Sequence, residues 1–188
     1  MSPLSRELRE GTGANHASLD ASLDFDSPNT EVADYARFLC RMHAFHRPIE
    51  RRLMSSPLAR RALPDWRRRE RASRARADLN QLSVACIDDG TMPPIHVPMR
   101  DLPELMGVAY VFEGSTLGGQ VLTRILSRRL GIEANAMTYI NGYGEDTGAM
   151  WKSFVTKLDQ FQFTTSDRAR AVHAANRTFD DLLHWLAA

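Results

Sequence analysis

The sequence has two cysteines, no long apolar run and almost no net charge, and each shortage excludes a class of protein. Cys40 and Cys86 form neither a Cys-x-x-Cys pair nor a disulfide framework, so we expect both to be reduced, half-buried helix residues. No run approaches the roughly 18 apolar residues that a membrane span requires. A formal net charge of +1 creates no overall field that would attract nucleic acid or an anionic membrane.

The N-terminal residues 1–7 lack the apolar core of a signal peptide and are expected to be mature sequence. Together with the absence of an apolar span, this predicts a cytoplasmic protein that binds neither membranes nor nucleic acid.

Apolar residues recur at spacings of three and four over most of the chain, which is typical of amphipathic helices. No segment alternates apolar and polar residues for more than a few positions, so strands are not expected. The 188 residues suffice for one domain with a substantial core. We therefore predict an all-α fold in a single domain, residues 1–188. The predicted helices cover about residues 3–23, 30–54, 66–87, 102–130, 146–161 and 166–186.

Several boundaries follow from individual residues. Ser2 is expected to cap the first helix, with Pro3 at its first position. Pro48 should kink the second helix or end its regular part. Residues 90–103 contain four prolines and are expected to form a loop, and residues 141–144 a turn. The inward-facing residues of the second helix are predicted to be Val32, Tyr35, Phe38, Leu39, Met42, Phe45 and Ile49.

Residues 107–120, GVAYVFEGSTLGGQ, contain four glycines in an otherwise apolar, helical stretch. Each glycine inside a helix costs roughly 1 kcal/mol relative to alanine, so some compensating interaction is expected. Gly107, Gly114 and Gly118 have spacings that place them on one helix face. Two explanations stay open: another helix packs closely there, or the helix bends over a flat ligand and lies almost against it.

His16 lies in the first predicted helix, four residues from both Thr12 and Asp20. A lone helical histidine is usually exposed or hydrogen-bonded, but these two neighbours could orient the ring of a metal ligand. No Glu-x-x-His motif occurs, which argues against a di-iron carboxylate bundle. The remaining histidines are predicted to be structural or exposed: His43, His46, His96, His173 and His184.

Two segments together resemble one family. Residues 8–23, LREGTGANHASLDASL, resemble the proximal helix of haem oxygenases, and residues 110–122, YVFEGSTLGGQVL, resemble their distal helix in its bacterial form. Residues 143–154, YGEDTGAMWKSF, are a third, weaker match. Because the order and separation of the segments also fit, most of the chain is similar to the bacterial, biliverdin-producing branch of that family.

The resemblance implies that His16 is the axial ligand of the haem iron. It implies that Arg9 and Lys152 pair with the haem propionates, and that Thr12 and Tyr110 also belong to the haem site. Ion pairs at exposed positions contribute little affinity, so the two cations would mainly orient the ring.

On the opposite side of the haem, Gly114, Gly118 and Gly119 match the distal glycines that let the backbone approach the ring. Ser115 occupies the position where animal enzymes carry an aspartate that organises distal water. It could hold a water near the distal oxygen.

The resemblance further implies an enzyme that uses O₂ and electrons to cleave haem, both substrate and cofactor, into biliverdin, CO and iron. The sequence has no Rossmann fingerprint or cysteine cluster, so a separate reductase or ferredoxin must supply the electrons. A biliverdin-accepting photoreceptor is a candidate partner. The cleaved meso carbon, the physiological reductant, the oligomeric state and the choice between iron acquisition and chromophore supply stay open.

Two alternatives stay open at this point. The first is a non-catalytic haem-binding or storage protein of the same fold, and the second is a helical interaction domain whose glycines only pack helices. The basic run at residues 67–71, continued by Arg74 and Arg76, could dock an acidic electron donor. Its composition favours a solvated helix face instead.

Overall fold

The computed structural model describes residues 2–23, 25–86, 93 and 95–188. Within these ranges the secondary structure is helical, with no strand, which confirms the predicted all-α fold. No helix in these ranges is long and apolar enough to cross a membrane. The helices are α1 (Leu4–Ser22), α2 (Val32–Ser55), α3 (Pro57–Ala62), α4 (Trp66–Arg69), α5 (Ala72–Gln81), α6 (Leu102–Gly114), α7 (Gly119–Leu130), α8 (Thr147–Asp159) and α9 (Thr165–Ala187), with short 3-10 turns η1 (Ala134–Ala136) and η2 (Gly144–Asp146).

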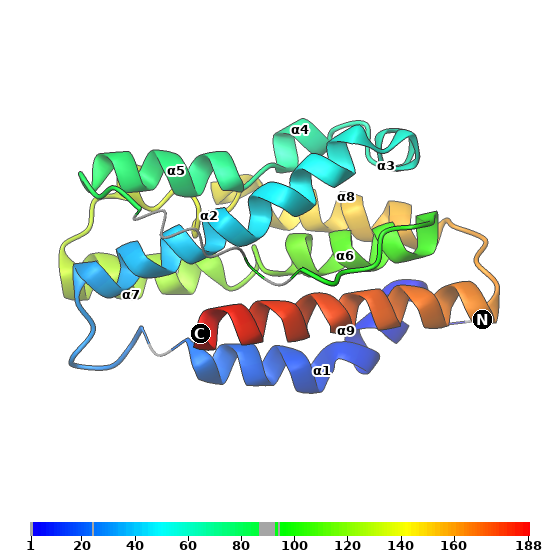
Figure 1. Cartoon of the computed structure of the whole chain (residues 1–188), viewed down its shortest axis with the longest axis horizontal. Helices are drawn as coiled ribbons and strands as arrows, with labels where there is room; N and C mark the ends of the chain where they lie inside the picture. The colour runs from blue at the N-terminus through cyan, green and yellow to red at the C-terminus, as the bar shows by residue number, and fades with distance from the viewer. Residues whose placement is uncertain (1, 24, 87–92, 94) are drawn as a thin grey trace.

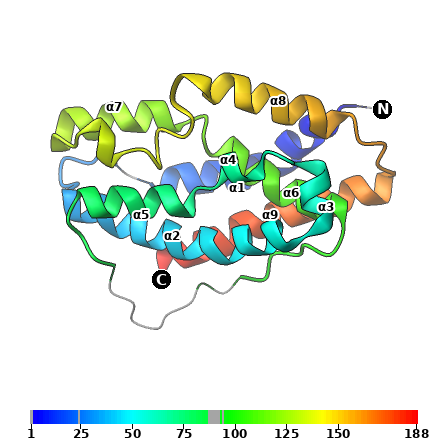
Figure 2. The same ribbon diagram turned by 90° about the horizontal axis from the view of Figure 1, so that it is seen from above.

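The helices lie roughly along one direction, with α1 and α9 side by side (Figure 1). These two helices run parallel, as shown by hydrogen bonds from Arg168 to Glu7 and from Asn15 to Asn176. Viewed from above, α7 and α8 form one flank of the bundle, and α2 and α5 lie toward the other (Figure 2). Helix α6 runs through the middle and packs against α9.

The apolar face of α2 forms much of the core. Tyr35, Leu39, Phe45 and Ile49 are almost fully buried, as their helical spacing predicts. Val32 was also expected to face inward, but it is 39% exposed because it is the first residue of the helix. Pro48 is accommodated inside α2, which continues to Ser55.

The start of α1 differs from the prediction. Pro3, not Ser2, is the residue that precedes the first helical position, and no side chain caps this end. The Ser2 hydroxyl instead donates to the carboxylate of Glu7.

The predicted helix over residues 66–87 is two helices with a break at Glu70 and Arg71. The carboxylate of Glu50 on α2 accepts hydrogen bonds from the backbone N–H of Arg71, at 2.7 Å, and of Ala72. A carboxylate at this position stabilises the start of α5, because the free N–H groups and the helix dipole both favour negative charge. Helix α5 already ends at Gln81, and Ile87, the predicted end, lies outside the described residues.

The predicted helix over residues 102–130 is also divided. Helix α6 ends at Gly114, residues 115–118 form a turn, and α7 begins at Gly119. We call residues 115–118 the α6–α7 turn. Gly131 follows α7 in the left-handed conformation, with φ of 65°, which is typical of a glycine that ends a helix. Pro103, expected in the preceding loop, lies in the first turn of α6, where a missing N–H is tolerated.

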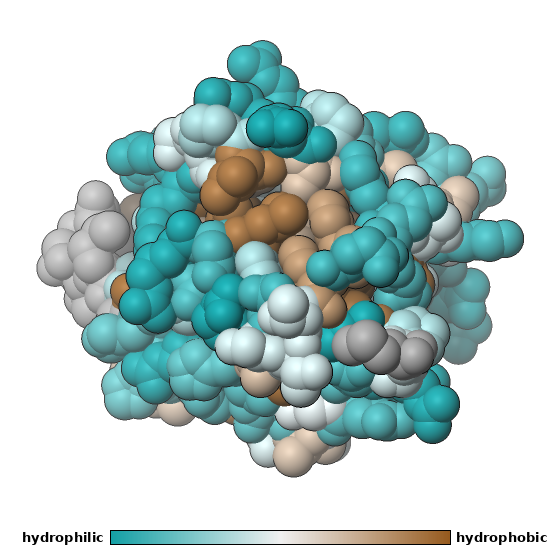
Figure 3. All heavy atoms as spheres, turned by 90° about the vertical axis from the view of Figure 1, so that its right-hand side faces the viewer, coloured by the Kyte–Doolittle hydropathy of each residue, from teal (hydrophilic) through white to brown (hydrophobic). Residues whose placement is uncertain are grey.

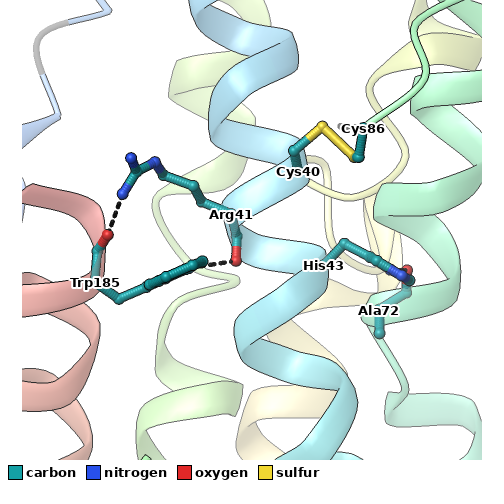
Figure 4. Close-up of a disulfide and its surroundings, with 6 residues drawn as sticks. All are labelled: Cys40, Arg41, His43, Ala72, Cys86 and Trp185. Atoms are coloured by element: carbon teal, nitrogen blue, oxygen red, sulfur yellow. Dashed lines mark hydrogen bonds between the residues drawn. A yellow bond between two sulfur atoms is a disulfide. The ribbon is translucent and has the colours of Figure 1, made fainter. Parts of the chain in front are cut away.

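Cys40 and Cys86 form a disulfide, so the prediction that both are reduced helix residues was wrong. Cys40 lies on α2, whereas Cys86 is exposed and follows the end of α5 (Figure 4). The antiparallel packing of α2 and α5 brings the Cα atoms of the two cysteines within 5.5 Å of each other. Cys40 and Cys86 are 46 residues apart in sequence. Nearby, the Trp185 indole N–H donates to the carbonyl of Arg41, which connects α9 to α2.

One end of the molecule carries apolar surface. In the view onto the right-hand end of Figure 1, hydrophobic side chains lie in a hollow surrounded by a polar rim (Figure 3). Phe161 and Phe163, in the connection between α8 and α9, stack with their ring centroids 5.2 Å apart.

Candidate functional site

A cavity of about 830 Å³ lies between α1, α2, α9 and the end of α6. This volume is within the range of about 300–1,000 Å³ that is usual for pockets that bind small molecules and cofactors. Its lining is mainly apolar and includes His16, Phe38, Met42, Phe179 and Leu182.

On α1, His16 faces this cavity and its side chain is 56% exposed. The Nδ1 atom lies 2.9 Å from the carboxylate of Asp20, and the ring contacts Phe179 edge-on with centroids 6.0 Å apart. Asp20 therefore has the orienting position that its spacing predicts, and the Nε2 atom is the ring nitrogen left to bind a ligand. Thr12 does not share this role, because its hydroxyl donates to the carbonyl of Leu8. It is buried and lines the cavity.

The end of α6 and the α6–α7 turn contribute glycines to the same cavity. A Cβ atom on Gly118 would meet nothing within 4 Å, and one on Gly114 would only touch the ring of Trp151 at 3.8 Å. Both residues line the cavity. Because Gly114 ends α6 and Gly118 precedes α7, neither has the penalty of a glycine inside a helix.

The other two glycines serve helix packing. A Cβ atom on Gly107 would lie 2.1 Å from the carbonyl oxygen of Ala171 on α9, and one on Gly119 would lie 1.7 Å from that of Ile140. No side chain could be placed there without moving a backbone. Close packing therefore explains Gly107 and Gly119, whereas Gly114 and Gly118 leave space at the cavity.

Behind the α6–α7 turn, Arg71 closes one side of the cavity and is only 4% exposed. Its guanidinium donates to the Ser115 hydroxyl at 3.0 Å and to the Tyr139 carbonyl at 2.7 Å, and lies over the Tyr139 ring. Ser115 also donates to the Phe112 carbonyl, so its hydroxyl is held in place from both sides.

Buried polar groups hold Arg71 and Tyr139 in position. The Tyr139 hydroxyl lies 3.0 Å from Nε2 of His46, and burial raises the pKa of Tyr139 to about 12. Burial also lowers the pKa of His46, so the ring is neutral at pH 7. Although burial opposes it, the nearby His46 and the backbone N–H groups of α5 hold the pKa of Glu50 below its usual value.

A second buried group fixes the end of α6. The Glu113 carboxylate pairs with Arg69 and accepts a hydrogen bond from the Tyr143 hydroxyl at 2.9 Å. Arg69 also pairs with Asp65 at 2.7 Å. Burial raises the pKa of Glu113, and the charge of Arg69 opposes this shift. These contacts hold the residue before Gly114 against α4.

The basic run at residues 67–71, continued by Arg74 and Arg76, is only partly solvated, because Arg67, Arg68 and Arg76 are exposed whereas the other arginines are buried or half-buried. Arg69 and Arg71 are buried, and Arg74 binds the carbonyl of Gly142. Arg68 pairs with Asp146 at 2.8 Å but stays exposed. Composition alone could not separate arginines that bind carboxylates and carbonyls inside the protein from arginines in water.

The two predicted propionate partners lie in different places. Arg9 is exposed and lines the cavity, near Tyr110. Burial raises the pKa of Tyr110, and the charge of Arg9 opposes that shift. The Tyr110 ring packs on Trp151 with centroids 5.5 Å apart. Lys152, the next residue, is exposed and does not line the cavity.

The other histidines have the structural or exposed positions that the sequence predicts. His46 is buried beside Glu50, His43 hydrogen-bonds the Ala72 carbonyl, and His173 and His184 are exposed. In the described part of the chain, no three histidine, cysteine or acidic side chains gather as a metal site. Sequence reasoning missed Arg71 and Tyr139 as cavity residues, and no periodic signal marked either one.

The fold and the site define an all-α protein with an apolar cavity, one imidazole available on α1, and two glycines, Gly114 and Gly118, that leave the backbone bare at the cavity. Comparison with known proteins identifies the family. The family described as "Heme oxygenase" matches residues 2–188. The chain therefore belongs to the haem oxygenase family and is an oxidoreductase, as its resemblance in sequence predicted.

One relative agrees with this assignment, and two solved structures share the fold. A protein named "Heme oxygenase" from Xanthomonas campestris is 33% identical over 154 residues, which cover 82% of this chain and 89% of the relative. The NO- and CO-bound heme oxygenase of Neisseria meningitidis has a similar fold, with a TM-score of 0.81 at 21% identity over 99% of this chain and 91% of that one. The heme oxygenase of Leptospira interrogans has a TM-score of 0.77 at 21% identity, covering 99% of each chain.

Proposed function

We propose that this enzyme cleaves haem to biliverdin, CO and iron, using O₂ and electrons, with His16 as the proximal ligand of the iron. One observation carries the proposal: His16 and the side-chain-free positions Gly114 and Gly118 line the same cavity. An imidazole on one side and bare backbone on another are what a flat, iron-containing ring requires. Residues 1–188 are proposed to act as a single domain.

The environment of His16 supports its role as a ligand. Asp20 accepts a hydrogen bond from Nδ1–H, which selects the tautomer with a free lone pair on Nε2. Phe179 limits the rotation of the imidazole from the α9 side. A neutral imidazole supplies less electron density to iron than a thiolate does.

The α6–α7 turn supports the choice of haem as the substrate. Because Gly114 and Gly118 carry no side chain, the backbone can cover one face of the ring without filling the space that O₂ needs. Ser115, whose hydroxyl is fixed by Arg71 and Phe112, follows Gly114 and lines the cavity, and we propose that it holds a water there. Gly119 contributes through its packing against Ile140, which sets the start of α7.

The propionates of haem are negatively charged, and Arg9 is the exposed cation at the cavity. We propose that Arg9 orients the ring in its plane and thereby selects the meso carbon that is cleaved. Tyr110 and Thr12 shape the same side of the cavity. Lys152 would have to reach the propionates from outside the cavity, so its proposed contribution is smaller.

Electrons are proposed to come from a separate reductase or ferredoxin, because no group of ligands for an iron–sulfur cluster occurs in the described residues. A biliverdin-accepting photoreceptor remains a candidate recipient of the product.

We also propose a cytoplasmic location, where reductases and ferredoxins that donate electrons operate. The Cys40–Cys86 disulfide is unusual for that compartment, so thiol labelling of the protein in intact cells would test the location.

A reaction in air tests the proposal. Purified protein is loaded with haem, and a reductase or ascorbate supplies electrons while the absorption spectrum is recorded. We expect the Soret band to disappear and a biliverdin spectrum to replace it. If the Soret band persists, the protein is a haem-binding or storage protein. If His16→Ala leaves the spectrum of bound haem unchanged, the proximal assignment is wrong.

A further inference from the structure

Exposed arginines gather where α2 ends and α3 follows it. Within residues 47–64 the single acidic residue is Glu50, which is 5% exposed and whose carboxylate accepts hydrogen bonds from backbone N–H groups at the start of α5. This segment therefore has positive charge at its surface without negative charge beside it in sequence. Its exposed arginines are Arg47, Arg51, Arg52, Arg60 and Arg61.

These arginines have no acidic partner within the part of the chain that the structure describes. Arg52 donates to the carbonyl of Val97, and Arg60 donates to the carbonyl of Met54 at 3.1 Å. The side chains of the other three form no hydrogen bond or ion pair within the same ranges, so their charges are available to an external anion.

Two apolar side chains are exposed among the arginines. Met54, near the end of α2, is 36% exposed, and Leu58, in the first turn of α3, is 42% exposed. Arg51 lies three residues before Met54 and Arg61 three residues after Leu58, so each apolar side chain has an arginine on the same helix face. We call these two residues and the five arginines the α2–α3 patch.

The α2–α3 patch lies away from the haem cavity. Helix α3 follows the far end of α2 (Figure 1), and no residue of the patch lines the cavity. Along α2, Met54 follows the cavity residue Met42 by 12 residues, which corresponds to about 18 Å in an α-helix. An electron donor has to approach the haem, so this surface is poorly placed to bind one.

A lipid surface fits the patch better than a nucleic acid does. Both offer phosphates to the arginines, but exposed methionine and leucine side chains gain nothing from phosphates. In a bilayer, arginines bind the headgroups while apolar side chains beside them enter the boundary with the acyl chains. The combination of cations with exposed Met54 and Leu58 therefore favours a membrane.

We propose that the α2–α3 patch docks this protein on an anionic lipid surface. Met54 and Leu58 enter the headgroup region, the arginines bind lipid phosphates, and the haem cavity stays uncovered. The net charge of +1 conceals this surface, because acidic residues elsewhere in the chain balance the arginines. The inference goes beyond the proposed function and does not depend on haem cleavage.

Vesicle binding by the haem-free protein tests the proposal. The protein is sedimented with sucrose-loaded vesicles of phosphatidylglycerol and phosphatidylcholine, or of phosphatidylcholine alone. Arg47→Gln/Arg51→Gln/Arg61→Gln removes three charges from the patch without breaking a hydrogen bond within the described residues. The matched control is Arg76→Gln/Arg124→Gln/Arg128→Gln, which removes three exposed charges on α5 and α7. Circular dichroism verifies that both variants keep their helices.

We expect the wild type to sediment with the anionic vesicles and not with the neutral ones. An arginine near an anionic surface strengthens binding about fivefold, so the patch variant should bind about a hundredfold more weakly. The control should stay within about fivefold of the wild type, because its charges lie outside the patch. Leu58→Gln should weaken binding about fivefold through loss of apolar contact with the lipid.

The proposal is overturned if the wild type does not sediment with anionic vesicles, or if the patch and control variants lose binding equally. Binding to duplex DNA that exceeds binding to the vesicles and is unaffected by Leu58→Gln would also overturn it, in favour of a nucleic-acid surface. Haem degradation by the wild type without vesicles is measured separately, so failure of the proposed function and failure of this inference are distinguishable.

Discussion

Gly119 lies against Ile140 so closely that a Cβ atom would come within 1.7 Å of the Ile140 carbonyl oxygen, whereas Gly118 beside it has nothing within 4 Å. Two adjacent glycines of one motif therefore have different structural roles. Gly119 lets the start of α7 rest on the segment after η1, and Gly118 leaves the last position of the α6–α7 turn without a side chain at the cavity.

Alanine at these two positions should separate packing from ligand binding. Gly119→Ala forces the backbone at Ile140 to move, and we expect a loss of several kcal/mol in the free energy of unfolding, on the order of 3. Denaturant titration of the haem-free protein measures this loss.

Gly118→Ala is expected to leave the stability of the haem-free protein within about 1 kcal/mol of the wild type, because its φ of −77° suits any residue. It should weaken haem binding or change the ratio of product isomers, since the new methyl group occupies space near the ring. If Gly118→Ala instead unfolds the protein and Gly119→Ala does not, the division of roles is refuted.

The disulfide should contribute strongly to stability. It closes a loop between residues 46 apart, and the chain-entropy model gives about 4 kcal/mol for a loop of this size. We expect the Cys40→Ser/Cys86→Ser variant, and the wild type treated with dithiothreitol, to unfold at lower denaturant concentration by a matching amount. Dithiothreitol should not affect the double variant. An equal response of both proteins would show that the effect of the reagent has another cause.

Stability should depend on pH through His46. Burial lowers the pKa of this ring below its ordinary value of 6.5, so the unfolded chain binds a proton at a pH where the folded protein does not. The free energy of unfolding therefore falls as the pH decreases below about 6.5, with a limiting slope of about 1.4 kcal/mol per pH unit for one proton. The contribution of the neutral His46 ring to the free energy of unfolding is fully present above about pH 6.5.

Denaturation of the haem-free protein between pH 5 and 8 measures this slope, and His46→Gln is the control without the titrating group. Glu113 and Asp78, whose pKa values burial raises, act with the opposite sign as the pH rises above their unfolded values. Both remain in the control, so the difference between the two slopes reports His46 together with its neighbour Glu50, whose pKa depends on His46. Equal slopes would mean that His46 is protonated to the same extent in both states.

The buried pair of Arg69 and Glu113 should show strong coupling. Arg69→Met leaves the Glu113 carboxylate buried with only Tyr143 as its partner, and we expect a loss of about 3–5 kcal/mol. Adding Glu113→Gln to Arg69→Met should restore part of the lost stability, because the unpaired charge of Glu113 is removed. Additive losses in a double-mutant cycle would show that the pair does not act as a unit.

Helices could be predicted from local spacing more reliably than their ends. The apolar periodicity of α2 correctly placed Tyr35 and Ile49 in the core. The break between α4 and α5 was missed, because its cause is Glu50, which lies 21 residues from Arg71 in sequence. The α6–α7 turn was anticipated only as a bend, since the four glycines of residues 107–120 look alike in the sequence.

The sequence by itself determined the all-α class, the family, and the two local motifs around His16 and Gly114, because helical periodicity and glycine content are properties of neighbouring residues. Only the tertiary structure decided which glycines face the cavity, that Cys40 meets Cys86, and that Arg71 is buried. Each of these depends on what a distant segment places opposite the residue, and a charge or a thiol has the same appearance in the sequence whether it faces water or the protein interior.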